Sequence, residues 1–347
     1  MKDYGKSLDR FYVALGTPLK DDRFTVDYDA FRKLVKHFSD CPEFAEVGGV
    51  IVLPEAGEVF SLEREEKQEL IRITVEEAKG KLPVFAGVYS YNVPQTVLQA
   101  KDAQELGVDG LFIMPAGGAM DITLTLNKAK NPWSYIELAK AVAKEVDLPF
   151  LAHAAGPADA WSIGFPPEAV VKMMEEVPNF VGWKMLYTST PAYLAVAKAL
   201  REYEARSGHH VGLLAAGANM YYDAMLHGIM DGSISCHWNY ARDLNLKLIH
   251  AWKANDWAAM KHIWIEEGMF ELHQATTQGI DPNSNRLHSN FKVMTWLAGL
   301  IPNPYVRQPM VQPFKAEVEA LRDVRRKYNM PTISDEEINK VLETLPR

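Results

Sequence analysis

The sequence has little cysteine and no long hydrophobic run. Only two of its 347 residues are cysteines, Cys41 and Cys236, and their separation gives neither a disulfide framework nor the ligand spacing of a metal site. No stretch approaches the roughly 18 uninterrupted apolar residues that a transmembrane helix requires, and the first residues lack the apolar core of a signal peptide. We therefore expect a soluble protein of the reducing cytoplasm that does not act at a membrane.

Dense positive charge is also absent. The formal net charge is −8 at pH 7 and no dense run of lysine and arginine occurs, which argues against nucleic acid or an anionic membrane surface as a partner. The ten histidines show no clustered ligand spacing, and the Gly-x-Gly-x-x-Gly fingerprint of dinucleotide-binding proteins is missing. These absences predict a protein that acts on small molecules without a metal ion or a nucleotide.

Short apolar runs that alternate with longer amphipathic segments fill the first three quarters of the chain. This alternation is typical of parallel βα units, and the chain is long enough for one barrel of about 250 residues with an extension, although two domains of ordinary size also fit. The expected strands are 11–15, 48–53, 83–88, 110–114, 149–152, 180–184, 211–215 and 232–236. Eight such strands predict an α/β fold, a (β/α)8 TIM barrel.

Helical patterns occupy the segments between these strands and the rest of the chain. Within the barrel they cover 62–78, 94–106, 132–145 and 167–176, with prolines near several first turns. After the eighth strand the pattern is helical at 243–253, 257–275, 289–299 and 312–328, with no strand among them. We therefore expect a barrel over residues 1–240 and a C-terminal helical extension over 241–347 that packs on it.

Lys184 ends the apolar segment Asn-Phe-Val-Gly-Trp-Lys at 179–184. A buried parallel strand there would place this lysine at a strand C-terminus, where barrel enzymes hold their active sites. In an enclosed pocket a lysine loses hydration, which disfavours its charged form and leaves the amine free to attack a ketone. Lys184 is thus a candidate for a lysine that forms a Schiff base. The alternative is a lysine that extends its ammonium group into solvent, which is the commoner arrangement.

Several motifs in order along the chain resemble the dihydrodipicolinate synthase / N-acetylneuraminate lyase family of class I barrel lyases, over about residues 13–328. They are Val-Ala-Leu-Gly-Thr-Pro at 13–18, Asp-Tyr-Asp-Ala at 27–30, Pro-Glu-Ala-Gly-Glu at 54–58, Phe-Val-Gly-Trp-Lys at 180–184, Gly-Ile-Met-Asp-Gly-Ser-Ile at 228–234, Gly-Leu-Ile-Pro at 299–302 and Val-Arg-Gln-Pro at 306–309. The resemblance implies a pyruvate-like 2-oxo acid bound as an imine to Lys184, no external cofactor, and a homotetramer.

The chain also departs from the family's pattern. His153, in His-Ala-Ala-Gly-Pro, stands where the family has the tyrosine that moves protons beside the imine. Glu55 and Ala56 stand where the family has two threonines, of which the first relays protons to that tyrosine and the second helps to hold the pyruvyl carboxylate. The segment 115–118 lacks the tyrosine that reaches a neighbouring subunit, and 157–164 lacks the synthase arginine. These losses argue against dihydrodipicolinate synthase activity itself.

The candidate catalytic residues are Lys184, His153 and Glu55. A histidine titrates near neutral pH and can give and take protons at a strand end, although a structural histidine bonded to a backbone carbonyl is the alternative. Glu55 follows a buried strand and is interpreted either as the partner of His153, a second base, a contact for a substrate hydroxyl, or a solvated loop acid. If it pairs with His153, we expect it to raise the pKa of the imidazole. Glu58 is interpreted as structural, because it can accept loop N–H groups.

A second group of residues is assigned to substrate binding because each follows or ends a predicted strand, or aligns with a binding residue of the family. Trp238 and Asn219 have structural alternatives, which are packing under the helical extension and capping of the next helix. His209 and His210 precede a strand at the opposite end of the barrel and are expected to be a surface pair. The assigned residues are Ala56, Gly57, Gly217, Asn219, Ile234, Trp238 and Asn239.

Three functions are compatible with these residues. The first is a lyase that forms an imine on Lys184 and catalyses aldol cleavage or condensation, or hydratase-aldolase chemistry. Glu-Val-Phe-Ser-Leu at 58–62 is similar to the Glu-Phe-Phe-Ser-Leu of sugar-acid dehydratases such as 5-dehydro-4-deoxyglucarate dehydratase, so dehydration is an alternative. The third is a non-catalytic sensor of 2-oxo acids that keeps Lys184 as a ligand. The sequence cannot name the substrate, because specificity depends on loop shape.

Overall fold

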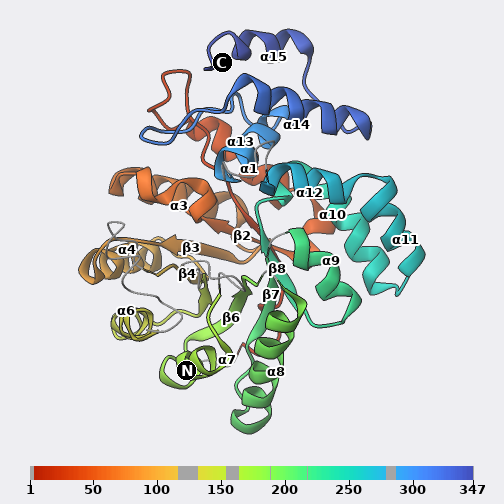
Figure 1. The fold of residues 1–347 in the computed structure, drawn as a ribbon. Helices are drawn as coiled ribbons and strands as arrows, with labels where there is room; N and C mark the ends of the chain where they lie inside the picture. The colour runs from red at the N-terminus through yellow and green to blue at the C-terminus, as the bar shows by residue number, and fades with distance from the viewer. Residues whose placement is uncertain are drawn as a thin grey trace.

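Eight parallel strands close into a barrel with helices around it (Figure 1). The computed structural model describes residues 4–115, 132–153, 164–187, 189–216, 218–278 and 287–346, and for residues 218, 219 and 278 only the backbone is described. The strands pair in sequence order, and the barrel closes where Phe11 of the first strand pairs with Ser233 of the last. This is the (β/α)8 barrel that the sequence predicts.

The strands are almost entirely buried on both faces, which explains why they read as continuous apolar runs. Each observed strand begins and ends within one residue of its predicted bounds, so the strand prediction is confirmed. The strands are Phe11–Ala14 (β1), Gly48–Val52 (β2), Val84–Val88 (β3), Gly110–Ile113 (β4), Phe150–Ala152 (β5), Phe180–Met185 (β6), Gly212–Ala215 (β7) and Gly232–Ser235 (β8).

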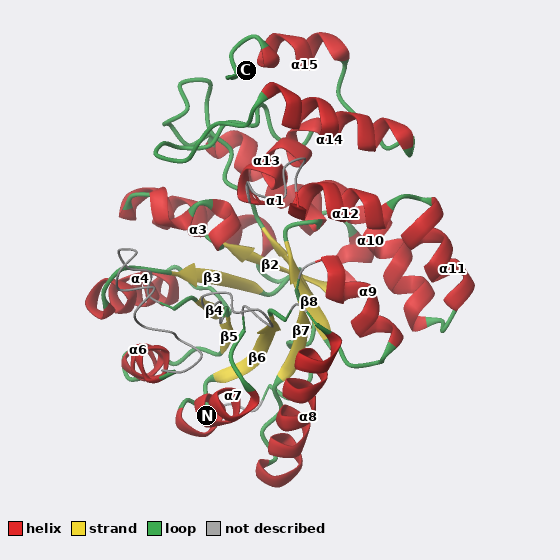
Figure 2. Ribbon diagram, viewed as in Figure 1, coloured by secondary structure: helices red, strands yellow, loops and turns green. Residues whose placement is uncertain are grey.

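Helices form the outer layer of the barrel, and Figure 2 shows them as a ring outside the strands. Several begin at a side chain that accepts the free N–H of the first turn: Asp27 accepts from Ala30, and Asn92 accepts from Gln95. The helices of this layer are Tyr28–Ser39 (α1), Pro42–Val47 (α2), Arg64–Ala78 (α3), Val93–Glu105 (α4), Trp133–Ala143 (α6), Pro167–Glu176 (α7), Thr190–Ser207 (α8) and Ala218–Leu226 (α9). The four helices predicted between strands are all present.

The chain after β8 is helical and lies along one side of the barrel (Figure 1). The helices are Trp238–Lys253 (α10), Trp257–Lys261 (α11), the π-helix His262–Glu266 (η3), Met269–Gln278 (α12), Leu287–Leu297 (α13), Lys315–Lys327 (α14) and Asp335–Leu342 (α15). The prediction of helices without strands is therefore confirmed for the residues of this part that the structure describes.

Two details of the C-terminal prediction are wrong. The single helix expected at 257–275 is three elements, because a π-helical turn and a left-handed Gly268 interrupt it. The final helix α15 was not predicted. Its capping box was present in the sequence, since the Ser334 hydroxyl accepts from the N–H of Glu337, whose carboxylate in turn accepts from the N–H of Ser334. Nowhere in the described ranges is a helix both long and apolar enough to span a membrane.

Candidate active site

Lys184 lies near the C-terminal end of β6, at the mouth of the barrel. Residues two apart on a strand share a face, so Gly182 occupies the position below it on the same side. A Cβ on Gly182 would come within 2.6 Å of Leu151 and 2.8 Å of Leu214, which belong to the two flanking strands. The glycine thus lets two leucines fill the barrel beneath the lysine, and the lysine stands on an apolar floor.

Burial lowers the pKa of the Lys184 amine from its ordinary value, although nearby Cys236 and Glu55 oppose the change. The Lys184 Nζ atom lies 5.7 Å from the centre of the Phe112 ring, on β4. Cys236 follows β8, and burial raises the pKa of its thiol to about 12, which keeps it protonated. Burial therefore leaves a fraction of the amine neutral at a lower pH than for a lysine in water.

His153 follows β5 directly and is buried at the same mouth. The β5–β6 pairing joins Ala152 to Trp183, so one further step along both strands brings His153 beside Lys184. The His153 N–H donates to the Ile113 carbonyl at 2.8 Å, and the imidazole packs edge-on against the Phe112 ring with centroids 5.2 Å apart. Main chain and ring packing thus fix the direction of this imidazole.

Glu55 partners His153. The His153 Nε2 atom is 3.0 Å from Glu55 Oε2, and the side chains are 6% and 46% exposed, respectively. A carboxylate partner requires the proton on Nε2, so the buried Nδ1 atom, which has no hydrogen-bond partner among the described residues, carries the free lone pair. The expected proximity of Glu55 to His153 is observed.

The expectation that this pairing raises the pKa of His153 is wrong. Burial and the nearby Lys184 charge lower the pKa of His153 below its ordinary value, and the hydrogen bond to Glu55 does not compensate. Burial also acts to raise the pKa of Glu55, but the hydrogen bond and charge of His153, with smaller contributions from His288 and Lys184, hold it below its ordinary value. At neutral pH the pair is an ionised carboxylate beside a neutral imidazole.

The turn that carries Glu55 is flanked by two residues with a left-handed backbone conformation. It is a 3₁₀ turn, Glu55–Gly57 (η1), between Leu53 and Glu58, which both have left-handed φ values, 58° and 61°. Gly57 is required because a Cβ there would lie 2.7 Å from the Leu15 carbonyl oxygen. A second 3₁₀ turn, Val59–Ser61 (η2), follows and leads into α3. The turn therefore fixes the backbone position of Glu55 at the mouth.

Glu58 anchors this turn to the C-terminal helices. Its carboxylate pairs with Lys292 of α13 and accepts the backbone N–H of Arg307 at 3.0 Å, and both charged side chains of the pair are only 4% exposed. Burial lowers the pKa of Lys292, and Glu58 opposes that change. A structural role was expected for Glu58, but its partners lie more than 230 residues away rather than in its own loop.

Some of the other residues assigned to substrate binding lie outside the described ranges, and others are buried in the barrel. Gly217 lies outside the described residues, as do most of 115–118 and 157–164, and only the backbone of Asn219 is described. Ile234 is buried within β8, and Ala56 is partly buried in η1. Trp238 is fully buried against Phe11 and Phe44, and packing accounts for it.

Asn239 links the two strands that close the barrel. Its amide Nδ2 donates to the Ala14 carbonyl at 2.7 Å and to the Cys236 carbonyl at 2.9 Å, at the ends of β1 and β8. The side chain is 2% exposed, which makes this a contact inside the protein. We therefore leave Trp238 and Asn239 out of the site that we propose below.

Three residues of the site were not identified from the sequence: Phe112, Cys236 and His288. Phe112 lies inside an apolar strand, and no local pattern shows which of its residues faces the mouth. His288 is in the first turn of α13, within electrostatic range of Glu55 and Lys184. It follows Glu55 by more than 230 residues, so only the packing of α13 on η1 brings it near.

A layer of buried polar groups lies behind β8. The His237 and His273 rings lie with centroids 3.8 Å apart and planes tilted by 33°, and among the described residues His237 Nε2 and both ring nitrogens of His273 have no hydrogen-bond partner. Burial lowers the pKa of His237 to about 3, and burial together with His237 lowers the pKa of His273. Both imidazoles are therefore neutral.

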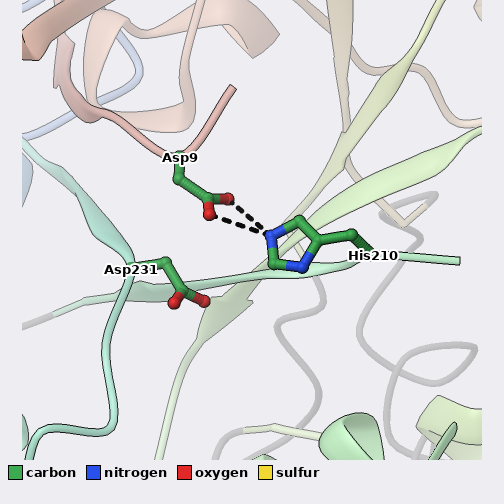
Figure 3. A group of neighbouring side chains, drawn as sticks. All are labelled: Asp9, His210 and Asp231. Carbon is green, nitrogen blue, oxygen red and sulfur yellow. Dashed lines mark hydrogen bonds and ion pairs between the residues drawn. The ribbon is translucent and has the colours of Figure 1, made fainter. Parts of the chain in front are cut away.

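The opposite end of the barrel holds a charged cluster of Asp9, His210 and Asp231 (Figure 3). One ligand atom from each lies within 4.8 Å of the others, a separation that a metal ion could bridge. His210 Nε2 is, however, 2.9 Å from Asp9, its Nδ1 is 2.8 Å from Glu204, and Arg201 pairs with Asp231 and Glu204. Each acid already has a cationic partner, so we interpret the cluster as an ion-pair network.

The prediction that His209 and His210 form a surface pair is wrong for His210. Its side chain is 8% exposed because it fills the space between Asp9 and Glu204. The hydrogen bond to Asp9 outweighs burial and, with Glu204, raises the pKa of His210. His209 is less buried, and its Nε2 atom lies 2.8 Å from the Phe180 carbonyl oxygen.

Fold and site together define a (β/α)8 barrel with a half-buried lysine at the end of its sixth strand. The sequence profile of the dihydrodipicolinate synthetase family matches residues 7–326. The chain therefore belongs to the dihydrodipicolinate synthetase family.

Curated relatives are similar at low identity. The 4-hydroxy-tetrahydrodipicolinate synthase of Endomicrobium trichonymphae is 29% identical over 198 residues, which cover 57% of this chain and 62% of the relative. The enzyme of that name from Helicobacter pylori is 25% identical over 91% of this chain and 97% of the relative. The match to the first of these relatives thus spans less than two thirds of its length, and the match to the second spans nearly all of it.

Solved structures share the fold. The dihydrodipicolinate synthase of Aquifex aeolicus superposes with a TM-score of 0.72 at 24% identity, over 94% of this chain and 99% of that one. YagE, a prophage protein of the family from E. coli K12 solved in complex with pyruvate, gives a TM-score of 0.74 at 19% identity, over 92% and 98% of the two chains. At these identities the likeness establishes the barrel and its C-terminal helices.

Proposed function

We propose that this protein is a lyase that forms a Schiff base between Lys184 and a pyruvate-like 2-oxo acid and makes or breaks a carbon–carbon bond. The observation that carries the proposal is the placement of a half-buried lysine beside the 3.0 Å pair of His153 and Glu55 at the barrel mouth. Burial supplies the neutral amine that attack on a ketone requires, and the pair supplies a group that moves protons. No external cofactor is needed, because the imine itself accepts electrons.

The chemistry follows from these groups. The Lys184 amine attacks C2 of the 2-oxo acid, and loss of water gives a protonated imine. When a hydroxyl on C4 gives up its proton, the C3–C4 bond breaks, an aldehyde leaves, and the electron pair moves into the imine to form an enamine. A proton returns to C3, and water then hydrolyses the imine to release pyruvate and the free amine.

His153 is the group that we propose for both proton transfers. Glu55 keeps the proton on Nε2, so Nδ1 is the basic nitrogen, and its lowered pKa leaves it unprotonated at neutral pH. The pyruvyl carboxylate is assigned to the η1 turn. Within that turn the Gly57 N–H already donates to the Pro54 carbonyl at 2.9 Å, so the Ala56 N–H is the better candidate.

Dehydration of a sugar acid is the second candidate, supported by the Glu-Val-Phe-Ser-Leu segment that continues the η1 turn. It shares the imine, but His153 would take a proton from C3 and give it to a hydroxyl that leaves C4 as water. Dehydration leaves the C3–C4 bond intact, whereas cleavage breaks it and releases pyruvate and an aldehyde. A sensor without catalysis would need Lys184 but no paired base, and the His153–Glu55 pair therefore favours an enzyme.

Borohydride trapping with pyruvate tests the proposal. We expect peptide mass mapping to find the reduced adduct on Lys184, and Lys184→Ala to lose it while the circular dichroism spectrum is unchanged. Lys67 is the matched control, because burial also lowers its pKa although it lies on α3, and Lys67→Ala should keep the adduct. An adduct at Lys67 or Lys292, or none with any 2-oxo acid, would refute the proposed function.

The organisation of the chain enters the proposal in two ways. We propose that the barrel unit ends near residue 240 and that 241–347 form the extension. This boundary falls within α10, at Ala241, whose φ and ψ of −143° and 34° interrupt that helix.

We also propose a homotetramer as the assembly. Because the segment 115–118 lacks the inter-subunit tyrosine of the family, the site would not depend on that assembly.

A further inference from the structure

His288 is brought to the barrel mouth by a buried ion pair. It precedes Lys292 by four residues on α13, so the two side chains share one face of the helix. Lys292 is fixed on Glu58, which directly follows the η1 turn that carries Glu55, and α13 packs against η1. The turn of α13 that holds His288 therefore faces the catalytic turn of the barrel.

The neighbours of His288 are the groups of the proposed site. Glu55, Lys184 and Glu58 are close enough to influence its ionisation, and burial, the largest effect, lowers its pKa so that the ring is neutral. The side chain is only partly buried, and no hydrogen bond or ion pair joins its imidazole to another residue in the part of the chain that the structure describes. The described residues therefore leave its ring nitrogens to a ligand at the mouth.

We propose that His288 is a substrate-binding residue that hydrogen-bonds a polar oxygen, a hydroxyl or a carbonyl, in the part of the substrate beyond the pyruvyl group. This inference rests on the proposed function, because Lys184 fixes C2 of the substrate and the His153–Glu55 pair serves C3 and C4. A neutral imidazole can both donate to and accept from such an oxygen. The C-terminal extension would thereby take part in choosing the substrate.

The experiment compares three probes by borohydride trapping: pyruvate, 2-oxopentanoate and 5-hydroxy-2-oxopentanoate. The last two have the same length and differ by one hydroxyl. We expect the wild-type protein to be half-saturated by the hydroxylated probe at a roughly 10-fold lower concentration than by 2-oxopentanoate, the effect of one hydrogen bond to an otherwise unpaired group. Because its hydroxyl is on C5, the hydroxylated probe is not cleaved by the retro-aldol reaction, and the adduct mass checks that the intact probe is trapped.

Two variants decide the role of the residue. His288→Phe keeps a ring of similar shape without nitrogen atoms and should lose the preference for the hydroxylated probe, whereas His288→Gln, which keeps a donor and an acceptor, should retain part of it. Half-saturation by pyruvate should stay within twofold in both. No preference in the wild-type protein, or an undiminished one in His288→Phe, would overturn the inference while pyruvate trapping on Lys184 leaves the proposed function intact. Failure of pyruvate trapping in the wild-type protein would overturn both.

Discussion

At the scale of single residues, the replacement of a tyrosine by His153 has the largest chemical consequence. A tyrosine hydroxyl titrates near pH 10 and needs a relay to act at neutral pH, whereas a buried neutral imidazole can accept a proton directly. Its pKa is lowered, so it becomes protonated, and loses its basicity, only below the ordinary value of about 6.5. We therefore expect activity to fall on the acid side, below pH 6.5.

This assignment predicts a specific loss in His153→Asn. Exchange of the pyruvate methyl protons with deuterated solvent, measured by NMR, reports proton transfer at C3 without any second substrate. We expect the variant to exchange roughly 10²–10⁴-fold more slowly, while borohydride still traps pyruvate on Lys184. His153→Tyr restores the family residue without its threonine relay and should recover little. Near-normal exchange in His153→Asn would instead assign the proton to Glu55.

Some of these residues could be predicted from the sequence and others could not. Lys184 and His153 end apolar runs, and a strand end is recognisable from local pattern alone, so both could be placed at the mouth. The direction of the His153 pKa could not be predicted, because it depends on how burial and the Lys184 charge weigh against one carboxylate. His288 carries no local signal, since its relation to Glu55 exists only after α13 has packed.

At the scale of elements, the buried contact between the η1 turn and α13 fixes the geometry of the mouth. Glu58 and Lys292 are each 4% exposed, so each ion depends on the other for stabilisation. Lys292→Met would leave the Glu58 carboxylate buried without its cation, which costs about 3–5 kcal/mol. We expect a loss of that size in the free energy of unfolding measured in urea.

The matched control for this prediction removes both charges. Glu58→Gln with Lys292→Met leaves no buried ion, and the glutamine Oε1 can still accept the Arg307 N–H that Glu58 accepts in the wild-type protein. The double variant should therefore recover most of the lost stability. Equal stability of Lys292→Met and the wild-type protein would show that the pair is not a structural anchor.

Element boundaries were predictable where a single local rule decides them. Strand ends follow the change from apolar residues to loop residues, which explains agreement within one residue at all eight strands. The break in the predicted helix at 257–275 was not visible, because the apolar pattern continues through the π-helical turn and only tertiary packing determines where the chain bends.

At the scale of the whole molecule, the two ends of the barrel carry different kinds of charge. The mouth holds the ionised Glu55 carboxylate beside the neutral His153 imidazole, whereas the opposite end is closed by the ion pairs of Asp9, His210, Glu204, Arg201 and Asp231. The pKa of His210 is raised, so the charged imidazole stabilises the fold fully below its unfolded value of about 6.5, and this contribution is lost as the pH rises through the folded value.

We therefore expect His210→Gln to destabilise the protein more at pH 6 than at pH 9. The difference should be about 1.4 kcal/mol for each unit by which folding raises the pKa. Urea unfolding at both pH values measures it. His209→Gln is the control, because the His209 ring contacts a backbone carbonyl. If His210→Gln lowers the free energy of unfolding by the same amount at both pH values, the imidazole contributes through packing alone.

The contact of Glu58 with residues near the end of the chain also bears on how the protein is synthesised. Lys184, His153 and Glu55 all leave the ribosome well before Lys292 and Arg307, the two partners of Glu58. A nascent chain that has emerged as far as residue 240 holds every strand of the barrel but cannot yet neutralise the carboxylate that ends the catalytic turn. The mouth can therefore reach its final structure only after α13 and the segment that follows it have been synthesised, which is later than the synthesis of the barrel strands.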